Sequence, residues 1–315
     1  MTERTMLIGD IGGTNARFAL SDLDAPGFSH EETLQCADFE TADAAIAKYL
    51  KNVGAPAPDV ICLAAAGPVI DQSVDITNNH WILSSRDLAA TFSTQAVRLL
   101  NDFEAIAYSI PSLNLVGSED YSIAVLGPGT GLGTAGLRKQ GKSLEVIPSE
   151  AGHTSFAPET ELQREILDLL SAKFDRVSVE HLVSGPGIEN IHWALGQRQF
   201  PESPAHSAAE IFADDSYHSM QAVGVFFEVL GQFARDFALS LGAYDGVFIA
   251  GGIVPRYPEL LQKSRFRASF ENRPGDQTDI SKIPTQLVSH PQPGLLGASY
   301  VALESLRGTE VMPTS

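Results

Sequence analysis

Two parts of the chain repeat one local pattern, in which a short apolar run leads into a turn rich in glycine and threonine. In the first part, residues 5–10 precede the turn Gly12-Gly13-Thr14, and the extended run 16–22 follows it. In the second part, residues 122–126 precede the turn 127–133, and the extended run 134–139 follows it. A repeated supersecondary pattern indicates a weak internal duplication, and it restricts the chain to two similar α/β lobes.

Further elements are predicted from hydrophobic periodicity. Apolar runs at 60–66, at 97–100, where Arg98 is the one polar residue, and at 246–250 are typical of strands buried on both faces. Helical spacing predicts helices at 44–51, 85–91, 159–173, 187–195 and 217–241. The polar segment 267–281, which contains proline and glycine, is predicted to be a surface loop.

The charge balance excludes several classes of protein. The 315 residues include 21 Lys and Arg against 39 Asp and Glu, a formal net charge of −18. Binding to nucleic acid or to an anionic membrane needs clustered cations, and no basic stripe is present. No window approaches the apolar length of a membrane span. Cys36 and Cys62 are the only cysteines, so we expect neither a disulfide framework nor a zinc site, and a reducing, cytosolic compartment.

Three turns are candidates for phosphate or nucleotide binding. Glycines let backbone N–H groups approach a phosphate, a threonine hydroxyl can donate to it, and a carboxylate can hold Mg²⁺. Because the chain is acidic, binding of the ATP anion requires such amides, hydroxyls or Mg²⁺ at the site itself. The alternative for each turn is a plain glycine-rich turn satisfied by its own residues. The candidates, in chain order, are Asp10 with Gly12, Gly13, Thr14 and Asn15; Gly129 with Thr130 and Gly131; and Gly251 with Gly252, placed at the adenosine end of a nucleotide.

One stretch matches the P-loop pattern without its context. Residues 136–143 read G-x-x-x-x-G-K-S, but that motif works only between a strand and a helix. Here the following residues alternate like a strand as far as Pro148. We therefore interpret 138–142 as the tip of a hairpin between two strands.

Polar residues that follow predicted strands suggest a site for a polyhydroxylated ligand. Asp102, after the run 97–100, is placed to accept a proton from a hydroxyl, whereas Asn101 with Glu104 three residues later resembles a helix capping box; both readings can hold together. Glu150 and His153 can accept and donate to several hydroxyls. Glu180 adds an acceptor or is simply a solvated acid near a helix start, and Asn78 and Asn79 lie in another polar cluster.

These residues together resemble the bacterial glucokinase family of the hexokinase, Hsp70 and actin superfamily. Six blocks match in order over almost the whole chain, from Leu7 to about Gly297. The blocks are Gly9-Asp10-Ile11-Gly12-Gly13-Thr14-Asn15-Ala16-Arg17, Asn101-Asp102-Phe103, Gly129-Thr130-Gly131-Leu132-Gly133, Glu150-Ala151-Gly152-His153, Leu182-Val183-Ser184-Gly185-Pro186-Gly187, and Phe248-Ile249-Ala250-Gly251-Gly252-Ile253-Val254-Pro255-Arg256.

The resemblance implies an α/β fold of two ribonuclease-H-like, actin-like ATPase lobes with a ligand cleft between them. We expect a small lobe at 1–110, joined by a C-terminal helix at about 293–307, and a large lobe at 111–292. The implied activity is ATP-dependent phosphorylation of glucose at its 6-hydroxyl, a step of glycolysis, by a cytoplasmic homodimer that requires Mg²⁺ and no zinc.

The same resemblance implies a role for each candidate residue. Asp102 is the general base, and Asp10 lies near Mg²⁺, which it contacts through water. The sugar hydroxyls are held by Asn101, Asp102, Glu150, His153 and Glu180, with Asn78 and Asn79 in a further sugar-side segment. The nucleotide is held by Asp10, Gly12, Gly13, Thr14, Asn15, Gly129, Thr130, Gly131, Gly251 and Gly252.

One departure from the family pattern affects the expected substrate. Ala151 stands where the family more often has glycine, and its methyl group is expected to narrow the sugar pocket. Two alternatives therefore stay open, a kinase for mannose or an N-acetylated hexosamine, and a non-catalytic sugar-sensing regulator. The regulator would need a DNA-binding module, which the charge opposes and for which the residues before Gly9 leave no room.

Overall fold

The computed structural model describes residues 4–94, 96–197, 205–272 and 279–308. The chain forms two compact units. The first contains Met1–Asp120, Leu137–Pro148 and His290–Ser315, and the second contains Tyr121–Gly136 and Ser149–Ser289.

The first unit is built on a five-stranded sheet whose spatial order is β3-β2-β1-β4-β7. β1 (Met6–Ile11) pairs antiparallel with β2 (Asn15–Ser21), and β2 pairs antiparallel with β3 (Phe28–Gln35). On its other side β1 pairs parallel with β4 (Val60–Ala65), and β4 pairs parallel with β7 (Ala96–Asn101). β4 is buried throughout, as its continuous apolar sequence predicts. A small antiparallel hairpin pairs β5 (Ser73–Asp75) with β6 (Ile82–Ser84).

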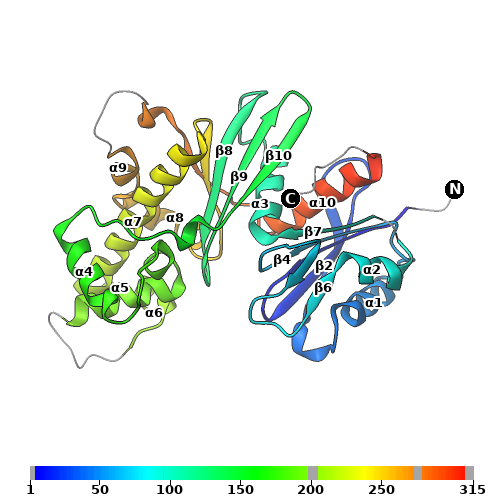
Figure 1. Cartoon of the computed structure of the whole chain (residues 1–315), viewed down its shortest axis with the longest axis horizontal. Coiled ribbons are helices and arrows are strands. Elements are labelled where there is room, and N and C mark those ends of the chain that lie inside the picture. The colour runs from blue at the N-terminus through cyan, green and yellow to red at the C-terminus, as the bar shows by residue number, and fades with distance from the viewer. Residues whose placement is uncertain (1–3, 95, 198–204, 273–278, 309–315) are drawn as a thin grey trace. The chain divides into compact units, whose positions relative to one another are not determined.

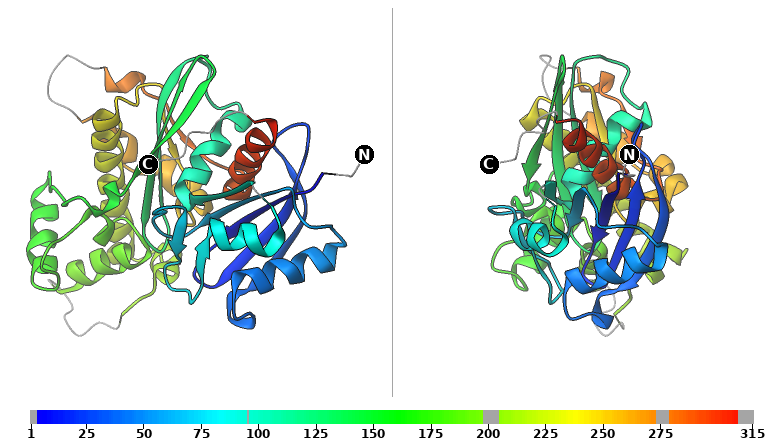
Figure 2. Two further views of the ribbon diagram at one scale, coloured as in Figure 1. Left: turned by 45° about the vertical axis from the view of Figure 1, so that its right-hand side comes forward. Right: turned by 90° about the vertical axis from the view of Figure 1, so that its right-hand side faces the viewer.

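Helices cover this sheet on both faces (Figures 1 and 2). Leu7 and Leu63 of the sheet share a core with Tyr49 of α1 (Ala42–Val53) and Leu88 of α2 (Ser85–Phe92). α3 (Asp102–Ser109) packs against α10 (Pro293–Arg307), which also contacts β1 and β4. The C-terminal helix therefore belongs to the same unit as the N-terminal strands.

The second sheet repeats the strand order of the first. Its order is β10-β9-β8-β11-β12, so numbering each sheet's strands along the chain gives 3-2-1-4-5 in both. The strands are β8 (Tyr121–Pro128), β9 (Leu132–Gln140), β10 (Ser143–Ser149), β11 (Gly246–Ile249) and β12 (Thr285–Leu287). β11 pairs parallel with both β8 and β12. The predicted internal duplication and the mixed α/β class are confirmed.

Six α-helices accompany this sheet among the described residues of the second unit. They are α4 (Glu161–Ser171), α5 (Gly185–Gln197), α6 (Ala208–Ala213), α7 (Tyr217–Leu241), α8 (Pro258–Lys263) and α9 (Phe266–Glu271). α7 begins after Ser216, whose side chain accepts from the Ser219 N–H, and ends at Gly242 with φ 63°. In the ranges that the structure describes, no helix is long and apolar enough to cross a membrane.

The structure confirms that the P-loop pattern is a decoy. β9 continues to Gln140 and β10 starts at Ser143, with Gly141 at φ 59° in the turn between them. A two-strand hairpin offers no helix N-terminus to a phosphate, so residues 136–143 lack the cradle on which the motif depends.

The predicted surface loop at 267–281 is wrong in its first part. Residues 266–271 form α9, and Phe266 and Phe270 are buried against α7. Their i,i+4 spacing puts both rings on one helix face. Gly231 of α7 permits the approach, because a Cβ there would lie 2.3 Å from the Phe266 carbonyl oxygen. Residues 273–278 lie outside the described residues.

Three histidines gather in the helical part of the second unit. The ring centroid of His192 lies 4.8 Å from that of His206 and 4.2 Å from that of His218. The Ser219 hydroxyl donates to Asp214 Oδ2 over 2.7 Å and lies 3.4 Å from His192 Nε2. Burial, reinforced by His218 and His206 and opposed by Asp214, lowers the pKa of His192 to about 4.

We expect this cluster to make the free energy of unfolding depend on pH. The native pKa of His192 lies below the ordinary value of 6.5, so the unfolded chain binds more protons than the native one between pH 4 and 6.5. Stability therefore falls as pH is lowered through that interval. Urea unfolding at several pH values in the interval tests this, and His192→Asn should flatten the slope even if it lowers stability overall. An equally steep slope in the variant would assign the effect to other groups.

Candidate active site

The first glycine turn connects β1 to β2 and is closed by its own backbone. The Gly12 N–H donates to the Asn15 carbonyl over 2.9 Å. A Cβ at Gly13 would lie 3.1 Å from the Thr77 carbonyl oxygen and 3.2 Å from Asn78 Cβ, so the segment 77–79 packs closely on the turn. A pocket of ≈ 290 Å³ opens here. Its lining consists of Asp10, Gly12, Gly13, Thr14, Asn15 and Arg17.

Asp10 is the carboxylate of this pocket, and Arg17 is placed beside it by the β1–β2 register. Arg17 Nη1 lies 3.8 Å from Asp10 Oδ2 and donates to Gln292 Oε1 over 2.8 Å. Loss of hydration raises the pKa of Asp10, and the Arg17 guanidinium opposes that rise. A Cβ at Gly294, in the first turn of α10, would lie 3.0 Å from Asp10 Oδ2. The helix N-terminus and Arg17 both favour the ionised carboxylate.

Asn78 and Asn79 differ in how their side chains are used. Asn79 Nδ2 donates to the Gly12 carbonyl over 3.0 Å, and Asn79 Oδ1 accepts from the Trp81 N–H over 3.1 Å. Asn79 thus ties its segment to the first turn. Asn78 has φ 58° and an exposed side chain, so of the two it is the better placed to reach a ligand.

Asn101 and Asp102 stand where β7 passes into α3. Asn101 Oδ1 accepts from the Phe103 N–H over 2.8 Å, Glu104 Oε2 accepts from the Asn101 N–H over 2.9 Å, and Asn101 Nδ2 donates to the Gly67 carbonyl over 3.0 Å. The predicted capping box is confirmed. Asp102 Oδ1 accepts from the Phe103 N–H over 2.9 Å, and its side chain is partly exposed at the carboxyl end of the strand.

The second and third glycine turns lie against each other within the second unit. A Cβ at Gly127 would lie 2.6 Å from the Ala250 carbonyl carbon, and a Cβ at Gly251, where φ is 83°, would lie 2.6 Å from the Pro128 carbonyl oxygen. Glycine is therefore required at both positions. The fold brings together Gly129, Thr130 and Gly131 with Gly251 and Gly252, as a nucleotide site would need.

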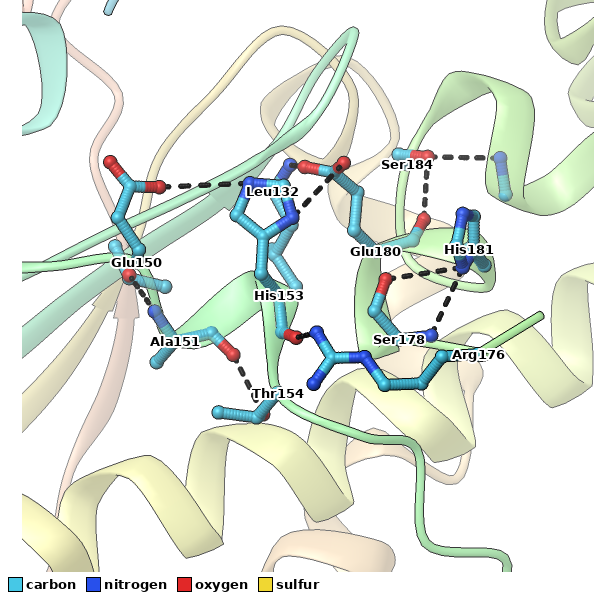
Figure 3. A network of polar contacts seen from close by, with 12 residues as sticks. Leu132, Glu150, Ala151, His153, Thr154, Arg176, Ser178, Glu180, His181 and Ser184 are labelled. Carbon is cyan, nitrogen blue, oxygen red and sulfur yellow. Dashed lines mark hydrogen bonds and ion pairs between the residues drawn. The ribbon is translucent and has the colours of Figure 1, made fainter. Parts of the chain in front are cut away.

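An acid–imidazole cluster adjoins the second turn (Figure 3). His153 Nε2 lies 3.7 Å from Glu150 Oε2, and His153 Nδ1 lies 3.8 Å from Glu180 Oε1. Glu150 and His153 are largely exposed, whereas the Glu180 side chain is 27% exposed. Glu180 Oε2 accepts from the Leu132 N–H over 2.7 Å. Glu180 is therefore no solvated acid, and the three side chains that the sequence singled out lie together.

Arg17 and Gln292 are residues of this region that reasoning from the sequence missed. Gln292 Nε2 also donates to Glu31 Oε1 over 3.1 Å, and Arg17 Nε lies 3.2 Å from the same oxygen. The signal for Arg17 was available, because a hairpin with the turn at residues 12–14 places residue 17 opposite residue 10. Nothing in the local sequence pointed to Gln292.

The chemistry of the first pocket suits Mg²⁺ carried in with phosphates. Within the described ranges, no three His, Cys, Asp or Glu side chains are grouped so that they could hold a metal ion. Mg²⁺ commonly uses one or two carboxylates together with water and substrate phosphates, and a dedicated protein cage is not needed. Asp10, which lines one pocket with Gly13 and Thr14, fits that arrangement.

Comparison with known proteins gives consistent matches over nearly the whole chain. The glucokinase family model matches residues 7–305. A glucokinase of Caulobacter sp. (strain K31) is 40% identical over 310 residues, which are 93% of this chain and 93% of the relative. The crystal structure of a glucokinase from an Antarctic psychrotroph is 34% identical with a TM-score of 0.85 and covers 96% of this chain and 99% of that one. A ROK family glucokinase from Streptomyces griseus, solved with glucose and AMPPNP, is 18% identical and similar in fold, with a TM-score of 0.66 over 95% and 99% of the two chains.

Proposed function

The chain belongs to the glucokinase family, and on that premise we propose that it transfers the γ-phosphoryl group of ATP to the 6-hydroxyl of glucose. The products are glucose 6-phosphate and ADP. The observation that carries the proposal is the family match over residues 7–305, which includes every candidate site residue.

Asp102 is the proposed general base. Its carboxylate takes the proton of the 6-hydroxyl while that oxygen forms a bond to the γ-phosphorus and the bond to the β-γ bridging oxygen breaks. The capping box holds the start of α3, and the Phe103 N–H donates to Asp102 Oδ1, which holds the carboxylate at the start of the helix. Positioning of this kind supplies much of the acceleration in phosphoryl transfer.

The remaining roles follow from the donors and acceptors that each residue offers. Glu150, His153 and Glu180 hold sugar hydroxyls, Asn101 uses its remaining amide hydrogen, and Asn78 reaches the sugar from the segment that Asn79 anchors. Backbone amides of the first and second turns receive the phosphates, and Gly251-Gly252 receives the adenosine end. When bound, Mg²⁺ supplies neutralisation of charge on the phosphates, and Asp10 would hold it through water.

The substrate is proposed to be glucose, although Ala151 departs from the family pattern. The Ala151 side chain packs against the core of the second unit. This packing gives no support to a narrowed sugar pocket, and it leaves Glu150 and His153 on either side as in the family motif. We also propose a cytoplasmic homodimer, in line with the family resemblance and with two buried, unpaired cysteines. Sedimentation velocity would decide the oligomeric state.

Hexose-dependent ADP formation is the decisive measurement. With Mg²⁺ and ATP we expect turnover with glucose, less with mannose or N-acetylated hexosamines, and little without a sugar. A chelator that removes Mg²⁺ should abolish turnover. Without the cation, the carboxylate of the first pocket and the net charge of −18 repel the phosphates of ATP. Failure to turn over any hexose would contradict the proposal, and a higher specificity for another hexose would reassign the substrate.

A further inference from the structure

Glu180 occupies the junction between the second glycine turn and the acid–imidazole cluster. Its Oε2 accepts from the Leu132 N–H over 2.7 Å, at the residue that ends the turn and begins β9. A Cβ at Gly131 would lie 2.6 Å from the same oxygen, so a side chain at that position would displace the carboxylate. The carboxylate therefore fixes the last amide of the turn, and this contact depends on the absence of a side chain at residue 131.

The other oxygen of Glu180 faces the sugar-side residues. Oε1 lies 3.8 Å from His153 Nδ1, whose ring also approaches Glu150. Figure 3 shows dashed lines from the Glu180 carboxylate to both the Leu132 amide and the His153 ring. One carboxylate thus has one oxygen committed to the turn and one oxygen directed to the proposed sugar hydroxyls.

The backbone around Glu180 makes this junction stiff. The Val179 N–H donates to the Thr154 carbonyl over 2.9 Å, and Arg176 Nη2 donates to the His153 carbonyl over 2.6 Å. The Gly185 N–H, in the first residue of α5, donates to the Gly129 carbonyl over 2.8 Å. Ser184 Oγ donates to the Glu180 carbonyl over 2.8 Å. The segment that carries Glu180 is therefore bonded to the His153 segment on one side and, through the start of α5, to the turn on the other.

We infer that Glu180 couples sugar binding to the nucleotide turn: a sugar hydroxyl that donates to Oε1 fixes the carboxylate, and the carboxylate fixes the Leu132 amide and the turn that receives phosphate. The inference rests on the proposed function and adds to it a route for communication within the second unit. Coupling of this kind is reciprocal, so a perturbation of the turn must also weaken the sugar.

Gly131→Ala tests this from the nucleotide side. The new methyl group displaces the Glu180 carboxylate, which is the end of a flexible side chain, so the turn contact is lost and the sugar acceptor moves. Gly224→Ala in α7 is the control in the same unit, because its Cβ would meet no atom within 4 Å and the residue lies outside the proposed sugar and nucleotide sites. By isothermal titration calorimetry with glucose and no nucleotide, we expect Gly131→Ala to weaken glucose binding about tenfold or more and Gly224→Ala to change it less than about twofold.

A second variant keeps the inference testable if Gly131→Ala does not fold. In Glu180→Gln the amide oxygen still accepts from Leu132, while the group facing the sugar becomes a donor. In the native enzyme we expect glucose to tighten binding of a non-hydrolysable ATP analogue with Mg²⁺ about fivefold or more, and in Glu180→Gln less than about twofold.

The outcomes separate the inference from the proposed function. If the native chain binds no glucose and forms no ADP, the proposed function fails. If it binds glucose but Gly131→Ala binds it equally well, or if Glu180→Gln retains the full tightening of the ATP analogue, the coupling through Glu180 is overturned while the kinase assignment stands. Loss of sugar affinity in Gly131→Ala with normal affinity in Gly224→Ala supports it.

Discussion

Replacing Asp102 by asparagine is expected to lower kcat about 10³-fold while glucose binding stays measurable, because a positioned general base contributes on this order. Asparagine keeps an amide oxygen that can accept from the Phe103 N–H, as Asp102 Oδ1 does over 2.9 Å. The fold of the β7–α3 junction should therefore survive. What the variant loses is the ability to take a proton from the sugar.

Asp87→Asn is the matched control for this measurement. Asp87 is an exposed acid in the first turn of α2, as Asp102 is in the first turn of α3, so both substitutions remove a negative charge near a helix N-terminus. That charge is worth about 0.3–1 kcal/mol of stability. Steady-state kinetics should show a normal kcat for Asp87→Asn. A near-normal kcat for Asp102→Asn would remove Asp102 from the role of base.

The sequence predicts the turns and the cap well because their causes are local. A glycine- and threonine-rich turn between two extended runs specifies a close backbone approach within a few residues, and Asn101 with Glu104 specifies a cap within three. The sequence also predicts the duplication, since each half contains its own extended run, glycine- and threonine-rich turn and second extended run. Once the hairpin register is known, the approach of Arg17 to Asp10 follows as well.

What the sequence does not reveal depends on contacts between distant segments. Arg17 meets Gln292 across 275 positions of the chain, and Glu180 meets Leu132 across 48. Neither pair has a local sequence pattern that predicts it, and the sequence around Glu180 is equally compatible with a solvated acid. The sequence does not predict α9 for a similar reason, since its two phenylalanines are buried by α7, a helix that is distant in the sequence.

The crossing of α3 and α10 shows how a distant contact can govern the catalytic base. Gly297 lies in α10, and a Cβ there would lie 1.7 Å from the Ala105 carbonyl oxygen and 3.1 Å from the Ser109 nitrogen, both in α3. These are backbone atoms, so they cannot rotate away. The two helices must separate, and α3 begins with Asp102.

We therefore expect Gly297→Ala to lower the free energy of unfolding by about 3 kcal/mol or more, at the upper end of overpacking effects. Gly224→Ala in α7 is the control, since its Cβ would meet no atom within 4 Å. Alanine should there stabilise the helix by about 0.5–1 kcal/mol. Urea unfolding compares the two variants. The folded fraction of Gly297→Ala should also show a reduced kcat, because the start of α3 moves with the helix. Native-like stability and kcat in this variant would show that the helices can separate freely, and that the crossing does not position Asp102.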